Sequence, residues 1–206
     1  MKIRLCFLSP PGSGKGTICK LICQSYPNVK HFDVGQMLRD KKDETIYQVQ
    51  KQGGLVDSNN VLTIFNQALA CDQFILDGSP RKENEAEHVL NHQNWISDPG
   101  YLIKINTPKQ VCINRLLKRG RFDDTPEAIE KRFEMFEQET MRSIELFKQK
   151  DRLIEIGGCG SPEDIFIRIV AEISLKETIE NYHKGSVSEE SFDPNSHVEL
   201  LGDSWE

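Results

Sequence analysis

The fold of this chain is decided by residues 9–17, which read Ser9-Pro10-Pro11-Gly12-Ser13-Gly14-Lys15-Gly16-Thr17. They follow a short apolar run, residues 3–8, and lead into a segment with helical spacing of apolar residues. Glycines let successive backbone N–H groups turn inward around phosphate oxygens, and the start of a helix adds positive potential. This stretch predicts a phosphate-binding loop in which Lys15 reaches the β and γ phosphates of a nucleotide. Thr17 is a candidate contact for phosphate or for Mg²⁺ water.

The loop departs in two places from the general phosphate-loop pattern. Ser9 stands where the first glycine is usual, and Gly16 separates Lys15 from Thr17. Neither change prevents phosphate binding, because the other glycines, Lys15 and the expected start of a helix all remain.

Outside the loop, short β-rich runs alternate with longer helical patterns. The expected strands are residues 3–8, 74–76, 101–105 and 153–156, with a further one near 29–32. This alternation predicts an α/β fold, a parallel sheet flanked by helices. Helical spacing is clearest over residues 162–175 and over 126–148. We expect one shared buried face in the latter, made by Ile129, Phe133, Phe136, Ile144 and Phe147.

Length and charge limit the classes of protein. A chain of 206 residues, 37% hydrophobic, suits one compact domain, and its net charge of −6 argues against general binding to nucleic acid or membrane surfaces. The six cysteines form no C-x-x-C pair, which indicates reduced thiols. The first apolar run is too short for a signal peptide or a membrane span. We therefore expect a cytoplasmic protein.

The composition changes at Lys184. Residues 184–206 are rich in Gly, Ser, Pro and acids, which indicates a flexible acidic tail after a domain of residues 1–183. Leu200, Leu201 and Trp205 leave open the alternative that this tail docks on the domain.

Charged residues follow the strands and helices in a pattern that suits phosphoryl transfer. The run 74–76 ends in Asp77-Gly78, which places a carboxylate where it can orient Mg²⁺ water. Transfer also needs positive charge around the migrating group. The candidates are clustered arginines: Arg81, Arg115, Arg119, Arg121 and Arg132.

Four motifs in order resemble the adenylate kinase family. They are Pro11-Gly12-Ser13-Gly14-Lys15-Gly16-Thr17, Gly35-Gln36-Met37-Leu38-Arg39, Asp77-Gly78-Ser79-Pro80-Arg81 and Arg119-Gly120-Arg121-Phe122-Asp123-Asp124-Thr125. The resemblance covers roughly residues 1–175. It implies a P-loop nucleotide-binding fold with a five-stranded parallel sheet, an acceptor-binding insert at about 34–60 and a short lid at about 119–125. This lid has no cysteine, which excludes a four-cysteine zinc lid.

The same resemblance implies an activity and a role for each residue. The γ-phosphoryl group of ATP·Mg²⁺ would pass to a nucleoside monophosphate, with AMP favoured, in a monomeric enzyme. Arg39 and Arg81 would hold the acceptor phosphate, and Lys15, Arg119, Arg121 and Arg132 would neutralise the donor phosphates and the moving group. Arg115 and the backbone near Gly160 would flank the donor adenine. The acceptor nucleotide would also contact Val34, Val56, Gly78 and Glu85.

Three departures from the family pattern leave the acceptor base open. Val34 stands where Thr is usual, Gln36 where Asp is usual, and Glu85 where Gln is usual. A Gln amide both donates to adenine N1 and accepts from its N6 amine, whereas an ionised Glu only accepts. Guanine and cytosine offer donors to a carboxylate, so GMP and CMP are alternative acceptors. Two further alternatives are a Glu85 that points to solvent and a catalytically weak nucleotide-binding protein.

Overall fold

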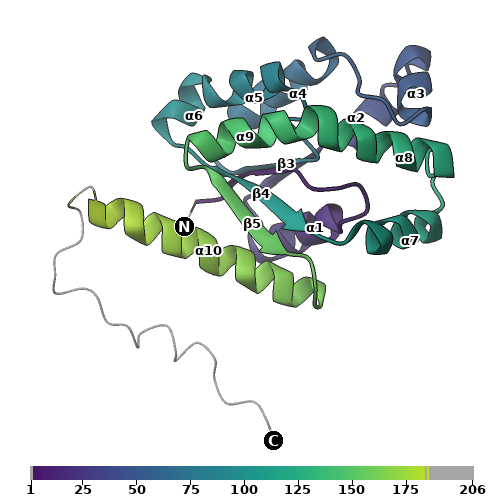
Figure 1. Ribbon diagram of the computed structural model, residues 1–206. Coiled ribbons are helices and arrows are strands. Elements are labelled where there is room, and N and C mark those ends of the chain that lie inside the picture. Colours follow the sequence, from purple (N-terminus) through teal and green to yellow (C-terminus); the bar gives the residue numbers. More distant parts are fainter. Residues whose placement is uncertain (1, 184, 186–206) are drawn as a thin grey trace, which may run out of the picture.

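The computed structural model describes residues 2–183 and 185, and its centre is a five-stranded sheet (Figure 1). The strands are β1 (Arg4–Phe7), β2 (Lys30–Asp33), β3 (Phe74–Asp77), β4 (Tyr101–Asn106) and β5 (Leu153–Gly157). Their order across the sheet is β2-β3-β1-β4-β5, and every neighbouring pair is parallel. The α/β expectation and all five predicted strands are confirmed.

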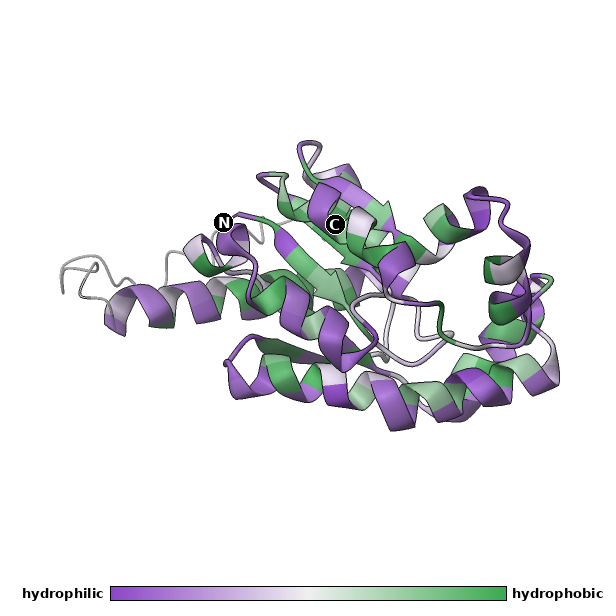
Figure 2. Cartoon of the chain, turned by 90° about the horizontal axis from the view of Figure 1, so that it is seen from above, coloured by the Kyte–Doolittle hydropathy of each residue, from purple (hydrophilic) through white to green (hydrophobic). Residues whose placement is uncertain are grey.

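Helices cover both faces of the sheet. α1 (Lys15–Ser25) and α10 (Pro162–His183) pack on one face, where Leu5 and Phe7 of β1 point. α4 (Asn59–Leu69), α5 (Glu83–Leu90) and α9 (Met141–Gln149) pack on the other, where Cys6 points. Figure 2 shows apolar strands lying between helices that carry both polar and apolar residues. A strand buried on both faces explains why Leu5, Cys6 and Phe7 of β1 are apolar at successive positions.

The helix expected over residues 126–148 is interrupted. α8 (Pro126–Met135) is followed by a π-helical turn, η1 (Phe136–Thr140), and then by α9. Ile129 and Phe133 pack with α7 (Lys109–Arg119), whereas Ile144 and Phe147 join the core beneath α4 and α5. The predicted residues are therefore buried, or half-buried in the case of Phe136, but they pack in two separate clusters. A π turn holds an additional residue, which rotates the helix that follows relative to the helix before it.

Smaller elements surround the carboxyl ends of the strands. α2 (Val34–Asp40) and α3 (Glu44–Lys51) lie within the predicted acceptor insert, and the loop joining α7 to α8 corresponds to the predicted lid. α6 (Gln93–Ser97) lies instead near the amino ends of the strands, where the Asn94 carbonyl accepts a hydrogen bond from Arg4 at 2.9 Å, and it places Trp95 in the core. The boundaries of the insert and of the lid stay predictions.

The C-terminal helix is longer than expected, since α10 continues to His183 rather than ending near residue 175. The predicted acidic tail, residues 184–206, lies outside the described residues except for Gly185. Within the described part of the chain, no helix is long and apolar enough to cross a membrane.

Candidate active site

A cavity of about 560 Å³ opens at the carboxyl ends of β1, β2 and β3. It brings together nearly every residue singled out from the sequence. Those that line it are Pro11, Gly12, Gly14, Lys15, Gly16, Thr17, Val34, Arg39, Val56, Asp77, Gly78, Arg81, Glu85, Arg115, Arg119, Arg121 and Arg132.

Two of the predicted residues lie apart from the cavity lining. Ser13 is buried, and its carbonyl accepts a hydrogen bond from the Arg115 guanidinium at 3.1 Å. Gly160 lies between β5 and α10 and does not line the cavity. The cavity thus brings together the other predicted residues from distant parts of the chain, whereas Ser13 and Gly160 do not line it.

The phosphate loop packs closely on α7. Gly12 has a φ of +82°, and a Cβ there would meet the Cys112 carbonyl oxygen at 2.4 Å, so both the conformation and the space favour glycine. The hydroxyl of Ser9 donates to the Leu8 carbonyl and accepts from the Ile105 backbone N–H, each at 2.7 Å. Ser9, which departs from the usual glycine, therefore ties the loop to β4.

Lys15 is a partly buried cation at the start of α1. Its Nζ donates to the Ser9 carbonyl at 3.1 Å and to the Pro10 carbonyl at 3.4 Å. Burial, assisted by the positive charge of Arg81 and opposed by Asp77, lowers the pKa of Lys15 to about 8. An anion entering the cavity would stabilise the charged form of this amine.

Asp77 lies opposite Lys15, at the end of β3. Its Oδ2 is 3.3 Å from Nε2 of His31 on β2. Burial alone would raise the pKa of Asp77, but the contact with His31 and the charge of Lys15 outweigh it, and the pKa is lowered. Asp77 is therefore a carboxylate at neutral pH.

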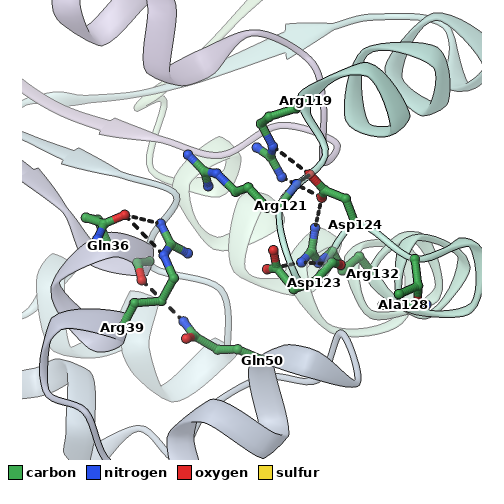
Figure 3. A network of polar contacts seen from close by, with 11 residues as sticks. Gln36, Arg39, Gln50, Arg119, Arg121, Asp123, Asp124, Ala128 and Arg132 are labelled. Carbon is green, nitrogen blue, oxygen red and sulfur yellow. Dashed lines mark hydrogen bonds and ion pairs between the residues drawn. The ribbon is translucent and has the colours of Figure 1, made fainter.

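Arginines of the predicted lid and of α8 are arranged around one buried carboxylate, Asp124. Arg119 donates two hydrogen bonds to it, at 2.9 and 2.7 Å, and Arg132 donates a third at 3.0 Å. Arg132 also pairs with Asp123. Burial would raise the pKa of Asp124, but the hydrogen bonds from Arg119 and from the Arg121 backbone outweigh it and lower the pKa. Figure 3 shows Arg121 extending from this cluster toward Arg39.

The acceptor side carries its own cations. Arg39 donates to the side-chain oxygen of Gln36 at 2.9 and 3.1 Å, so the residue that replaces the usual Asp orients this guanidinium (Figure 3). Arg81 donates to the Gly78 carbonyl at 2.6 Å and lines the cavity.

Glu85 does not point to solvent. It is 3% exposed, and its Oε2 accepts from the backbone N–H groups of Arg81 and Lys82 at 2.8 and 3.3 Å. Its Oε1 accepts from the Ser58 hydroxyl at 3.1 Å. The solvent-facing alternative is excluded, since the carboxylate both caps the start of α5 and lines the cavity.

Sequence reasoning missed several cavity-lining residues, among them His31, Asp33 and Gln50. Asp33 ends β2 and is the register partner of Asp77, so the signal that indicated Asp77, a strand ending in a carboxylate, applied equally to it. Gln50 donates to the Gly35 carbonyl at 3.3 Å, while its Oε1 is buried without a hydrogen-bond partner among the described residues. Nothing in the local pattern of α3 distinguishes Gln50 from its polar neighbours.

The described lining residues make the cavity positively charged, although the whole chain is negatively charged. Its lining has eight Lys and Arg side chains and four Asp and Glu side chains, whereas the whole chain carries a net charge of −6. A cavity of this kind attracts anions strongly, because its walls restrict the screening by water.

Comparison with known proteins agrees with the motifs. Residues 7–152 match the family model described as adenylate kinase. An adenylate kinase of Prochlorococcus marinus (strain MIT 9211) is 32% identical over 185 residues, covering 85% of this chain and 99% of that protein. One from Synechococcus sp. (strain CC9902) is 35% identical over 179 residues, covering 82% of this chain and 97% of its own. Human adenylate kinase isoenzyme 5 is 30% identical over 178 residues, covering 79% of this chain and 31% of that protein.

Proposed function

The chain belongs to the adenylate kinase family, and we propose that it transfers the γ-phosphoryl group of ATP·Mg²⁺ to AMP, forming two molecules of ADP. The observation that carries this proposal is the convergence of Lys15, Arg39, Arg81, Arg119, Arg121 and Arg132 on one cavity. These cations come from five separate segments of the chain. Two nucleotides with their phosphates facing each other need such a distribution of charge.

The donor side is assigned to the phosphate loop and the lid. Backbone N–H groups of residues 12–17 would bind the donor phosphates, and Lys15 would bridge toward the group in transit. Arg119 and Arg132, held by Asp124, would enter the site already oriented, so little side-chain entropy remains to be lost when the phosphates bind. Arg115 beside the loop would flank the donor base.

The acceptor side is assigned to Arg39 and Arg81. Both guanidinium groups line the cavity, and a planar guanidinium suits the two oxygens of a phosphate. Val34 and Val56 line the same region and would provide apolar contacts for the acceptor nucleotide, with Gly78 close to Arg81. Removal of water around these groups would strengthen each interaction during transfer.

The residues present suit Mg²⁺ carried with the donor. Mg²⁺ prefers oxygen ligands and keeps several of its waters, and Asp77 is an ionised, nearly buried carboxylate beside the phosphate loop. Asp77 would orient these waters, and Thr17 is a second oxygen in the same lining. The ion itself would neutralise charge on the donor phosphates.

A monomer in a reducing, cytoplasmic compartment is part of the same proposal. The reducing compartment is supported by six unpaired cysteines, of which only Cys159 is exposed. The phosphates of the two nucleotides account for the positive charge of the cavity, so no further partner is needed to explain it.

A coupled assay that follows ADP tests the activity directly. With ATP·Mg²⁺ as donor, AMP should give the highest kcat/KM among AMP, GMP, CMP and UMP. Binding of ATP without transfer to any of the four would favour the nucleotide-binding alternative, and a preference for GMP or CMP would overturn the acceptor assignment.

A further inference from the structure

Three side chains with different donor atoms meet beside the phosphate loop: Cys19 on α1, His31 on β2 and Asp77 on β3. Their ligand atoms, one sulfur, one imidazole nitrogen and one carboxylate oxygen, all lie within 4.8 Å of one another. The closest pair is His31 Nε2 and Asp77 Oδ2, at 3.3 Å. No other such cluster of three or more is found among the described residues.

The spacing is close to that of a tetrahedral metal site. Zinc bonds of about 2.0 to 2.3 Å at tetrahedral angles place ligand atoms roughly 3.3 to 3.8 Å apart. His31 and Asp77 already have this separation, and the remaining pairs need shifts of about 1 Å at most to reach it. Three protein ligands leave the fourth position to water.

The donor set selects the kind of ion. Mg²⁺ binds oxygen almost exclusively and would find one suitable ligand among these three side chains. A thiolate and an imidazole suit Zn²⁺ and similar borderline ions. Two anionic ligands, Cys19 and Asp77, would balance the charge of one divalent ion, and coordination would release the thiol proton of Cys19 to solvent.

The cavity provides the route of entry. His31 and Asp77 line it, and the His31 side chain is 23% exposed, whereas Cys19 is fully buried. An ion would therefore reach His31 and Asp77 first and Cys19 last. Lys15 and Arg81 lie in the same lining and would oppose this entry, which favours an ion that gains strong bonds to nitrogen and sulfur over one held by charge alone.

We propose that Cys19, His31 and Asp77 form an inhibitory site for Zn²⁺ or a similar borderline divalent cation. An ion held there takes Asp77 away from the water of ATP·Mg²⁺ and so stops phosphoryl transfer. The inhibition rests on the proposed function, but the binding does not, so the two are tested separately.

Binding is measured with Co²⁺, which replaces zinc in such sites and gives a thiolate charge-transfer band in the near ultraviolet. Titration of the full reduced chain should produce this band with one equivalent of Co²⁺, and Zn²⁺ should remove it. Cys19→Ala should abolish the band, and Cys159→Ala, which removes the exposed thiol instead, should keep it. Absence of the band from the wild-type protein, or its persistence in Cys19→Ala, would overturn the site.

Inhibition is measured in zinc-buffered assays at fixed free Mg²⁺ and ATP. The zinc concentration for half inhibition should rise roughly tenfold to a hundredfold in Cys19→Ala, since even the loss of groups that support a metal ligand has effects of this size. Equal inhibition of wild type and Cys19→Ala would show that zinc acts elsewhere. If Cys19→Ala does not fold, His31→Gln replaces it. That variant should weaken Co²⁺ binding and alter the visible cobalt spectrum, and unchanged binding would refute the proposal.

Discussion

The ring of Tyr47 stacks on the ring of Phe122, with centroids 4.9 Å apart and planes inclined by 20°. Tyr47 belongs to α3 in the predicted acceptor insert, and Phe122 belongs to the loop that joins α7 to α8 in the predicted lid. Both side chains are about two-fifths exposed. The stack therefore joins the two segments proposed to cover the two nucleotides.

Phe122→Ala should weaken this connection without unfolding the protein. A stacked aromatic pair contributes about 0.5 to 1.5 kcal/mol beyond its buried area, so kcat/KM should fall roughly twofold to tenfold. The thermal midpoint should change little, because both rings are partly exposed. Phe122→Tyr should retain the activity, and Tyr182→Ala, which removes an exposed ring from α10, should have no effect. Equal kinetics for Phe122→Ala and the wild type would mean that the stack plays no part in turnover.

Lys15→Ala and Arg81→Ala should each lower kcat by several orders of magnitude. Each variant removes a positive charge from a site with little water, where such charge stabilises the transition state most. Circular dichroism should show a folded protein in both cases. Lys118→Ala on the exposed face of α7 is the matched control and should keep full activity. A near wild-type rate in either site variant would refute the assignment of that residue.

The affinity for ATP should depend on pH through Lys15. Its pKa is lowered to about 8 in the free protein, so below about pH 7 the amine is already charged and contributes no pH dependence. Bound phosphates favour the charged form and raise this pKa, so binding above pH 8 must take up a proton. Affinity should then fall by up to about tenfold per pH unit as the pH rises above 8.

Calorimetry in buffers of different ionisation enthalpy measures this uptake directly. The wild-type protein should take up close to one proton per ATP at pH 9 and close to none at pH 6.5 from this group. In Lys15→Ala the proton uptake that sets in near pH 8 should vanish. Its survival in that variant would assign the titration to another group.

Glu85→Gln should raise the preference for AMP over GMP by at least several fold in kcat/KM. Adenine N1 is an acceptor, and a carboxylate offers it no hydrogen, whereas a Gln amide does. An unmatched pair of buried acceptors costs about 1 to 3 kcal/mol. The Gln oxygen can still accept from the Arg81 backbone N–H, so α5 should stay capped. Glu83→Gln, exposed on the same helix, is the control, and an unchanged ratio in Glu85→Gln would leave Glu85 a purely structural cap.

Local features of this protein were readable from the sequence. The phosphate loop and the strands are determined by residues that lie within a few positions of one another in the sequence. Glycine content, the spacing of apolar residues in a helix and the composition of a strand are all such local patterns. The order of the four motifs then indicated the family and, with it, about half of the cavity-lining residues, including all of the lysines and arginines among them except Lys20. The acidic tail is a matter of composition and stays a prediction.

Only the tertiary structure determines which segments far apart in the chain come close together. The sequence around Phe136 has helical spacing throughout, yet packing against two different cores is accommodated by a π turn. The charged neighbours of Glu85 left open whether its side chain faces the solvent or the cavity, and only the structure shows that Ser58 and the start of α5 enclose its carboxylate. Cys19, His31 and Asp77 meet because α1 packs against β2 and β3. Such contacts depend on how the sheet orders its strands and closes the connecting loops, which no local pattern encodes.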